Sequence, residues 1–255
     1  MRIKSFDGTE IAVHEAGSGK PLLLFHGLFS SARINWIGPG TADKLAQAGY
    51  HVLTPDLRGH GESDAPDGAE FWPADALARD AEAIIDALGL GPDLVVGGYS
   101  LGVRVTVQLL ARRLGAGERF RGAILAGMGL DGVSSATGIR AEMFARVIRN
   151  HINGITPDRH DPDYEPQRFL ERSVPKPGSL RHLVDQLQEW QPVDLRKLDL
   201  PVLVTAGVDD RANGSPQALA EALPDGRYAE IPGNHMTAPS RPELAEAICT
   251  FLGRI

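Results

Sequence analysis

The chain has 255 residues, of which 42% are hydrophobic and 23% are charged. These proportions are close to those of globular proteins, and they exclude a disordered or collagen-like chain. The net charge is −7 and no dense Lys/Arg run occurs, so we expect a small-molecule partner, with no nucleic acid and no membrane. The single cysteine, Cys249, excludes an internal disulfide, and the N-terminal segment lacks an apolar run. Together they predict a cytoplasmic protein.

The first half of the chain alternates between predicted strands and predicted helices. Residues 1–15 predict a hairpin with a turn at Asp7-Gly8. Beyond it, apolar runs predict strands at 22–25, 51–54, 94–99 and 123–126, and amphipathic stretches predict helices near 40–48, 74–88 and 100–114. Continuous apolar strands that alternate with helices are typical of a parallel sheet covered on both faces.

This alternation stops between about Asp131 and Trp190, where the sequence predicts helices at 139–149, 167–172 and 180–189 and no strand. It resumes with a strand at 201–206, a helix near 215–222, a strand at 227–231 and a closing helix near 238–252. We therefore expect one α/β domain formed by residues 1–130 and 191–255. Residues 131–190 would be a helical lid inserted into that domain.

The segment Gly98-Tyr99-Ser100-Leu101-Gly102 lies where a predicted strand turns into a helix. It fits the pattern G-x-S-x-G, in which a tight turn presents a serine hydroxyl at the end of a strand. The two outer glycines fit this turn because a Cβ at either position would collide with nearby backbone. The Leu101 amide would lie at a helix N-terminus, where it can stabilise an oxyanion. We predict that Ser100 is a nucleophile; the alternative is an ordinary glycine-rich turn.

A serine nucleophile needs a base and an acid, which in this arrangement follow it in the order acid, then histidine. Four histidines follow Ser100, and only His235 lies outside the predicted lid, in a loop after a late strand. The acid is expected just after the strand at 201–206, where Asp209 and Asp210 are adjacent. We favour Asp210, with Asp209 as a turn residue. Asp131, after an earlier strand, is the alternative acid.

A second oxyanion donor is expected from the loop after the strand at 22–25. In His26-Gly27-Leu28-Phe29, Gly27 allows close backbone approach and the Leu28 amide is the candidate, to be paired with the Leu101 amide. His26 is interpreted as a structural residue of this loop. Apolar residues near these loops are candidates for lining the substrate pocket, and the alternative is that those of the lid only seal it to the sheet: Phe29, Ile34, Trp36, Tyr99, Met128, Leu130, Met143, Phe144 and Ile148.

Taken together, these segments resemble the α/β-hydrolase fold superfamily, in its small serine esterase and lipase-like branch. The resemblance is carried by His26-Gly27, Asp56-Leu-Arg-Gly-His-Gly-Glu-Ser63, Gly98-Tyr-Ser-Leu-Gly102, Gly207-Val-Asp-Asp210 and Gly233-Asn-His235. It implies a mostly parallel sheet of about eight strands with helices on both faces. It also implies that Asp210, three residues after a strand-end glycine, is the acid, and that Arg58 and His60 brace their loop. Val103 departs from the pattern, because many relatives carry glycine there.

The resemblance implies hydrolysis of carboxylic esters through an acyl-enzyme, and an apolar pocket under a small lid favours short to medium acyl chains. Ser100 argues against the branches that use an aspartate nucleophile. Carbon–carbon bond hydrolysis, lactone or amide hydrolysis and cofactor-free perhydrolysis on the same triad stay open. So does a small-ligand receptor with vestigial turnover. Because neither an H-E-x-x-H zinc pattern nor a complete phosphate loop is present, we predict no metal and no cofactor.

Overall fold

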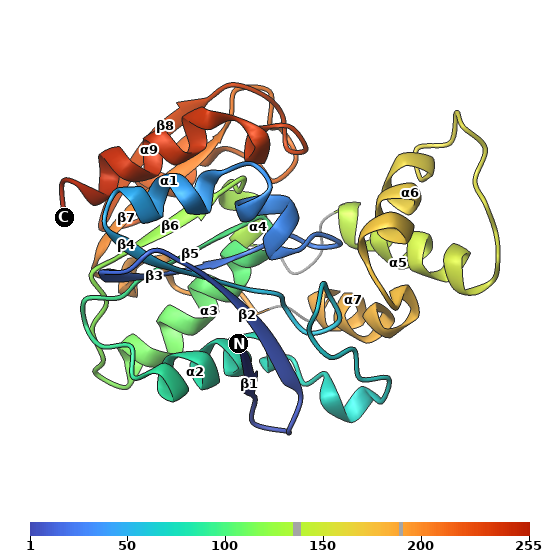
Figure 1. Ribbon diagram of the computed structural model, residues 1–255. Coiled ribbons are helices and arrows are strands. Elements are labelled where there is room, and N and C mark those ends of the chain that lie inside the picture. Colours follow the sequence, from blue (N-terminus) through green and yellow to red (C-terminus); the bar gives the residue numbers. More distant parts are fainter. Residues whose placement is uncertain (135–138, 189–190) are drawn as a thin grey trace.

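The computed structural model describes residues 1–134, 139–188 and 191–255. Its centre is an eight-stranded sheet in the order β1-β2-β4-β3-β5-β6-β7-β8 (Figure 1). The β1–β2 and β2–β4 pairs are antiparallel, and the other five pairs are parallel. This confirms the predicted mostly parallel sheet. The strands are β1 (Arg2–Lys4), β2 (Glu10–Ala16), β3 (Lys20–Phe25), β4 (Tyr50–Pro55), β5 (Val95–Tyr99), β6 (Gly122–Ala126), β7 (Pro201–Gly207) and β8 (Asp225–Ile231).

The central strands are apolar throughout because both faces of the sheet are covered. Along β3, Leu22 and Leu24 pack into one apolar cluster, whereas Leu23 and Phe25 pack into the other. Successive side chains of a strand point to opposite faces, so a strand buried on both faces has no polar positions. Figure 1 shows α1 (Thr41–Gln47) and α9 (Pro242–Leu252) on one face and α2 (Ala76–Leu88) and α3 (Leu101–Gly115) on the other.

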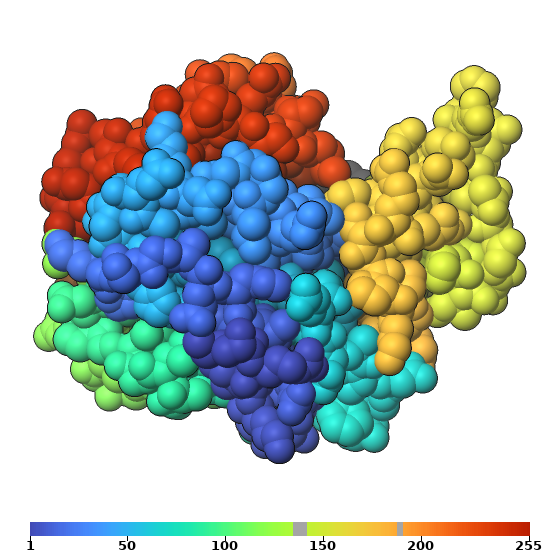
Figure 2. Space-filling model, viewed as in Figure 1, coloured from blue at the N-terminus to red at the C-terminus, as the bar shows by residue number. Residues whose placement is uncertain are grey.

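The remaining helices follow β6 and β7 in the chain. A short helix, α8 (Pro216–Glu221), connects β7 to β8, and four others lie between β6 and β7: α4 (Leu130–Ser134), α5 (Ile139–Ile152), α6 (Tyr164–Ser173) and α7 (Leu180–Gln188). In Figure 2 the yellow segment that contains α5, α6 and α7 forms a lobe beside the sheet domain. The division into a core and a lid at 131–190 stays a prediction, because 135–138 and the predicted helix end at 189–190 lie outside the described residues.

Two differences from the predicted elements concern short turns. Residues 33–37 form a π-helical turn, η1 (Arg33–Ile37), that the sequence did not predict. The closing helix starts at Pro242, preceded by a 3₁₀ turn, η5 (Ala238–Ser240), because proline fits the first turn of a helix, where its missing N–H is not needed. Within the described ranges, no helix is both long and apolar enough to cross a membrane.

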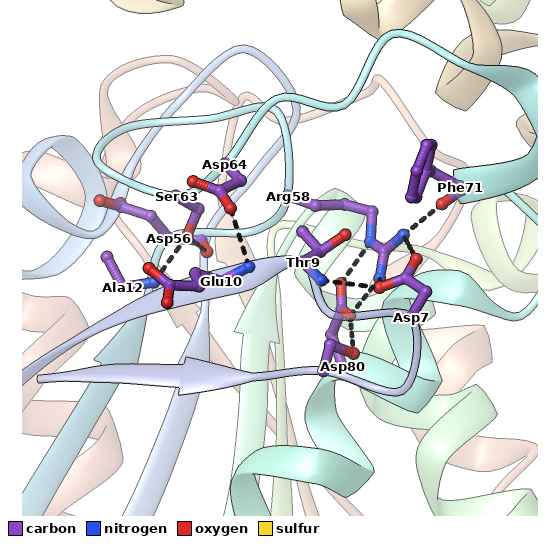
Figure 3. A network of polar contacts seen from close by, with 11 residues as sticks. Asp7, Thr9, Glu10, Ala12, Asp56, Arg58, Ser63, Asp64, Phe71 and Asp80 are labelled. Carbon is purple, nitrogen blue, oxygen red and sulfur yellow. Dashed lines mark hydrogen bonds and ion pairs between the residues drawn. The ribbon is translucent and has the colours of Figure 1, made fainter.

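A buried ion network joins three segments on one side of the sheet (Figure 3). Arg58, in the loop after β4, is fully enclosed and donates from Nε to Asp80 of α2 (2.7 Å) and from Nη1 to Asp7 of the β1–β2 turn (2.8 Å). It also donates to the carbonyl of Phe71. Burial lowers the pKa of Arg58, but the hydrogen bonds to Asp80 and Asp7 outweigh this effect and raise it, so the guanidinium stays charged.

This network predicts a large loss of stability when its cation is removed. Replacing Arg58 by Met leaves the buried carboxylate of Asp80 without its cation, and we expect the free energy of unfolding to fall by about 3–5 kcal/mol in urea titrations. Arg112→Met is the matched control, because Arg112 pairs with Glu82 and Asp75 at a partly exposed site. There we expect a loss below about 1 kcal/mol. Equal losses for the two variants would contradict this view of the network.

Candidate active site

Ser100 lies at the sharp turn between β5 and α3. Its φ of 53° is unusual for a residue with a side chain, and its ψ is −110°. The turn is tight enough that a Cβ built on Gly98 would lie 2.3 Å from the carbonyl carbon of Gly102, and one on Gly102 would lie 2.3 Å from the carbonyl oxygen of Phe25. Only glycine fits at both positions. The backbone therefore holds Ser100 in a conformation that it would not adopt by itself.

Three side chains from separate loops meet at the carboxyl edge of the sheet. His235, in the loop after β8, has Nε2 3.0 Å from Ser100 Oγ and Nδ1 2.8 Å from Asp210 Oδ2. Asp210 follows β7 and is only 4% exposed. If Nδ1 donates to the carboxylate, Nε2 is left to accept the serine hydroxyl proton. The structure thus brings together the serine, histidine and aspartate that the sequence singled out.

The two other candidate acids do not contact His235 in the same way. Asp209 is exposed, next to Asp210 but on the outside of the turn, and its N–H donates to the Gly233 carbonyl (3.0 Å). Asp131 is exposed and lies against Gly214. Asp210, in contrast, is buried and also accepts the Ala212 N–H (3.1 Å) through Oδ1. Of the three aspartates, Asp210 is the one hydrogen-bonded to the histidine.

Tyr99 connects the turn at Ser100 to the histidine loop. Its hydroxyl donates to the carbonyl of His235 (2.8 Å), and the two rings are 5.5 Å apart. Gly127 makes room for the tyrosine ring, since a Cβ there would lie 2.4 Å from Tyr99 Cζ. Tyr99 is one of the candidate pocket residues, and its sequence neighbours give no sign of this contact. The side chain is 3% exposed and links the turn at Ser100 to the loop of His235.

The loop after β3 lies directly beside the serine. A Cβ built on Gly27 would be 3.4 Å from Ser100 Cβ. Among the residues that the structure describes, the Leu28 N–H has no hydrogen-bond acceptor. Leu101 is the first residue of α3, a position where helices leave the N–H without an intrahelical partner. Both backbone amides named as oxyanion donors are therefore close to Ser100 in the chain or in space.

Two buried histidines support this loop as neutral side chains. In His26, Nδ1 faces the Gly27 carbonyl (2.8 Å) and Nε2 accepts the Leu57 N–H (2.9 Å). In His60, Nδ1 faces the Arg58 carbonyl (3.0 Å) and Nε2 accepts the Phe29 N–H (3.2 Å). These partners fix the proton on Nδ1 in both rings. Burial lowers the pKa of His26 and lowers that of His60 to about 3, so both rings are neutral near pH 7.

The residues expected to line a pocket lie in different environments. Phe29 of the loop and Phe144 of α5 have their rings edge to face, 5.3 Å apart. Trp36 is wholly enclosed in the core cluster of Leu22 and Leu24, which argues for a supporting role and against an open pocket wall. The others differ in exposure: Met128 and Ile148 are buried, Leu130 and Met143 are half-buried, and Ile34 is exposed.

No cluster of three or more His, Cys, Asp or Glu side chains suited to a metal ion occurs in the described part of the chain. Asp210 and Ser100 are hydrogen-bonded to Nδ1 and Nε2 of His235, respectively. The arrangement is therefore one that can transfer a proton from a serine hydroxyl to an imidazole and stabilise the resulting positive charge with a carboxylate.

Known proteins share this fold and parts of the sequence. A family model described as the alpha/beta hydrolase fold matches residues 20–143. Lipase 3 from Moraxella sp. (strain TA144) is 37% identical over 112 residues, which are 44% of this chain and only 34% of that protein. A non-heme haloperoxidase from Rhodococcus erythropolis is 29% identical over 232 residues, covering 82% of this chain and 81% of that protein.

A solved structure extends the similarity to the whole chain. A thermophilic esterase from Thermogutta terrifontis superposes with a TM-score of 0.78 and 25% sequence identity, covering 100% of this chain and 98% of that one. The sheet order, the serine turn after β5 and the helical segment between β6 and β7 are thus features of a known architecture. The chain therefore has the α/β-hydrolase fold.

Proposed function

We propose that the protein is a serine hydrolase that cleaves carboxylic esters. One observation carries the proposal: a continuous hydrogen-bonded series runs from Asp210 through His235 to Ser100, with distances of 2.8 and 3.0 Å. The similarity to proteins named lipase and esterase supports the same reaction class. A hydrogen-bonded nucleophile and base, with the base oriented by a third group, is the arrangement needed for nucleophilic catalysis.

In the proposed reaction, Ser100 Oγ attacks the ester carbonyl while its proton moves to Nε2 of His235. Asp210 stabilises the imidazolium, and the Leu28 and Leu101 amides donate to the oxyanion. The imidazolium then protonates the departing alkoxide, which leaves an acyl group on Ser100. His235 next takes a proton from water, the hydroxide attacks the acyl carbonyl, and the acid and the free serine are released.

Perhydrolysis is the second candidate, because a relative that matches 82% of the chain is a non-heme haloperoxidase. In this reaction hydrogen peroxide replaces water as the acceptor, and the acyl-enzyme gives a peracid and free serine. The reaction needs no new residue. Carbon–carbon bond, lactone and amide hydrolysis use the same triad, whereas a receptor would not release product repeatedly. Multiple turnover on an ester, with and without peroxide, separates these possibilities.

The role of Ser100 predicts covalent labelling by an organophosphonate at that residue alone. Ser100→Ala should abolish labelling and lower kcat by several orders of magnitude without unfolding the protein, and His235→Ala should lower kcat by a similar factor, because the members of a triad act as one unit. Intact mass and peptide mapping locate the adduct. Labelling of the wild-type protein at another serine would rule out this assignment. A slow residual rate in Ser100→Ala is expected, because the oxyanion donors remain.

The role of Asp210 predicts different effects for two adjacent substitutions. Asp210→Asn should lower kcat roughly 10²- to 10⁴-fold, because the imidazole loses its orientation and its counter-ion. Asp209→Asn should lower kcat by less than about tenfold, since its side chain is exposed and the hydrogen bond to His235 is made by Asp210. Both kcat values are measured on one aryl ester. The opposite ranking would overturn the assignment of the acid.

The apolar contacts at the mouth of the site favour short to medium acyl groups. Phe29 and Phe144 meet edge to face, and Met143 lies half-buried on the same helix. Each methylene that such a pocket buries contributes about 0.8 kcal/mol until the space is filled. Across aryl esters of increasing acyl length, kcat/KM should therefore rise and then fall at medium length. A steady rise to the longest chains would contradict this proposal and leave the triad unaffected.

A further inference from the structure

We propose that His60 is a positioning residue for the oxyanion hole: by accepting the Phe29 N–H, it keeps the neighbouring Leu28 amide directed at the oxygen of a carbonyl attacked by Ser100. The inference rests on the proposed function and adds to it a residue remote from the triad. His60 lies in the loop after β4 and touches the reaction only through the backbone of the loop after β3.

The direction of the Leu28 N–H depends on the peptide group that it shares with the Gly27 carbonyl. That carbonyl accepts the Ser30 N–H (3.2 Å) and faces Nδ1 of His26 (2.8 Å). In a trans peptide the N–H and C=O point in opposite directions. Donors that gather on the Gly27 oxygen therefore turn the Leu28 N–H to the opposite side of the peptide. Ser100 is close to this segment, since a Cβ built on Gly27 would lie 3.4 Å from Ser100 Cβ.

The peptide groups on either side of this one are held by side chains. The Gly27 N–H donates to Oδ1 of Asn35 (2.8 Å), and the Phe29 N–H donates to Nε2 of His60 (3.2 Å). Rotation of the Gly27–Leu28 peptide must also turn the peptides on either side of it. It would therefore break the hydrogen bond to Asn35 or the one to His60. Of the four consecutive amides from Gly27 to Ser30, those of Gly27, Phe29 and Ser30 have acceptors, and within the described structure the Leu28 N–H is left for a ligand.

This hold is needed because Phe29 has a φ of 60°. A bulky residue in this left-handed region is strained. Relaxation to negative φ would rotate the Leu28–Phe29 peptide and lose the hydrogen bond to His60. The burial of the Phe29 ring, which is 2% exposed, opposes the same relaxation. Imidazole and phenyl ring together thus keep the loop in its active shape.

His60 is well placed to act as a fixed acceptor. Its ring is fully enclosed, and Nδ1 donates to the carbonyl of Arg58 (3.0 Å), which leaves Nε2 as the acceptor. Arg58 is itself fixed by Asp80 and Asp7, as Figure 3 shows. The buried ion network therefore supports the oxyanion loop through His60. Because the ring stays neutral well below pH 7, its acceptor is available over the working range of a hydrolase.

Two amide variants test the roles of the two ring nitrogens of His60 separately. In His60→Gln, the longer side chain can place an oxygen near the Nε2 position and accept the Phe29 N–H. In His60→Asn, the shorter amide can replace only Nδ1 and donate to the Arg58 carbonyl. We expect kcat on an aryl ester to fall about 10- to 100-fold in His60→Asn, with KM within about threefold of wild type. In His60→Gln, kcat should stay within about threefold of wild type. Rates are divided by the concentration of active sites, titrated with the phosphonate.

A pair of inhibitors distinguishes positioning from general damage to the fold. An aryl trifluoromethyl ketone adds to Ser100 and presents an oxyanion, whereas the corresponding alcohol binds the same pocket without one. In His60→Asn the affinity for the ketone should fall in parallel with kcat/KM, and the affinity for the alcohol should not change. An equal loss of both affinities, or equal kcat values in the two variants, would overturn the proposal.

A measurement on the wild-type protein covers the case in which His60→Asn does not fold. Long-range ¹H–¹⁵N NMR of the imidazoles should show His60 neutral with its proton on Nδ1, and the Phe29 amide should be protected from hydrogen exchange. A proton on Nε2 would overturn the proposal directly. If the wild-type protein is not labelled by the phosphonate, the proposed function fails instead, and the tautomer and the amide protection report separately on the contact between His60 and Phe29.

Discussion

The close crossing of three backbone segments at the end of β5 sets the position of everything else in the site. Gly98 and Gly102 come so near each other, and Gly102 so near Phe25, that neither can carry a Cβ. This contact forces Ser100 into its left-handed conformation and fixes the distance between the serine and the loop after β3. Since β5 is a central strand with parallel neighbours on both sides, the turn is held from both directions and the strain cannot relax.

The second support comes from the loop between β4 and α2. Asp56 accepts the N–H of Ala32 (2.8 Å) and of Glu62 (2.9 Å), so its carboxylate ties the start of this loop to the segment after β3. Burial raises the pKa of Asp56, but the hydrogen bonds from these two amides and with the ring of His14 keep the pKa below its ordinary value. Gly61 is packed against this carboxylate, where a Cβ would lie 2.1 Å from an oxygen. One buried anion thus connects the loop to the oxyanion segment.

The sequence contains enough information to predict the sheet and to bring Ser100, Asp210 and His235 together. The reason is that their pattern is local: each follows a recognisable strand, and the carboxyl ends of parallel strands meet at one edge. The contact of Tyr99 with the His235 carbonyl joins residues 136 positions apart, and no periodicity indicates it. The enclosure of Trp36 is not predictable from the sequence either, because it depends on how η1 packs on the sheet and not on the apolar character of the residue.

The sequence predicts only part of the role proposed for His60, for the same reason. The motif around it predicts a braced loop, but the bond from Phe29 to Nε2 spans 31 positions, and the unusual φ of Phe29 cannot be read from an ordinary aromatic residue. Glycine at position 29 would adopt this backbone without strain, yet it would lose the ring that meets Phe144 of α5. The phenyl ring therefore links the oxyanion loop to the helical segment between β6 and β7. In the proposed hydrolase, a change in the position of α5 would act directly on the strained residue next to the Leu28 amide, so acyl-group packing would affect the geometry of the oxyanion hole.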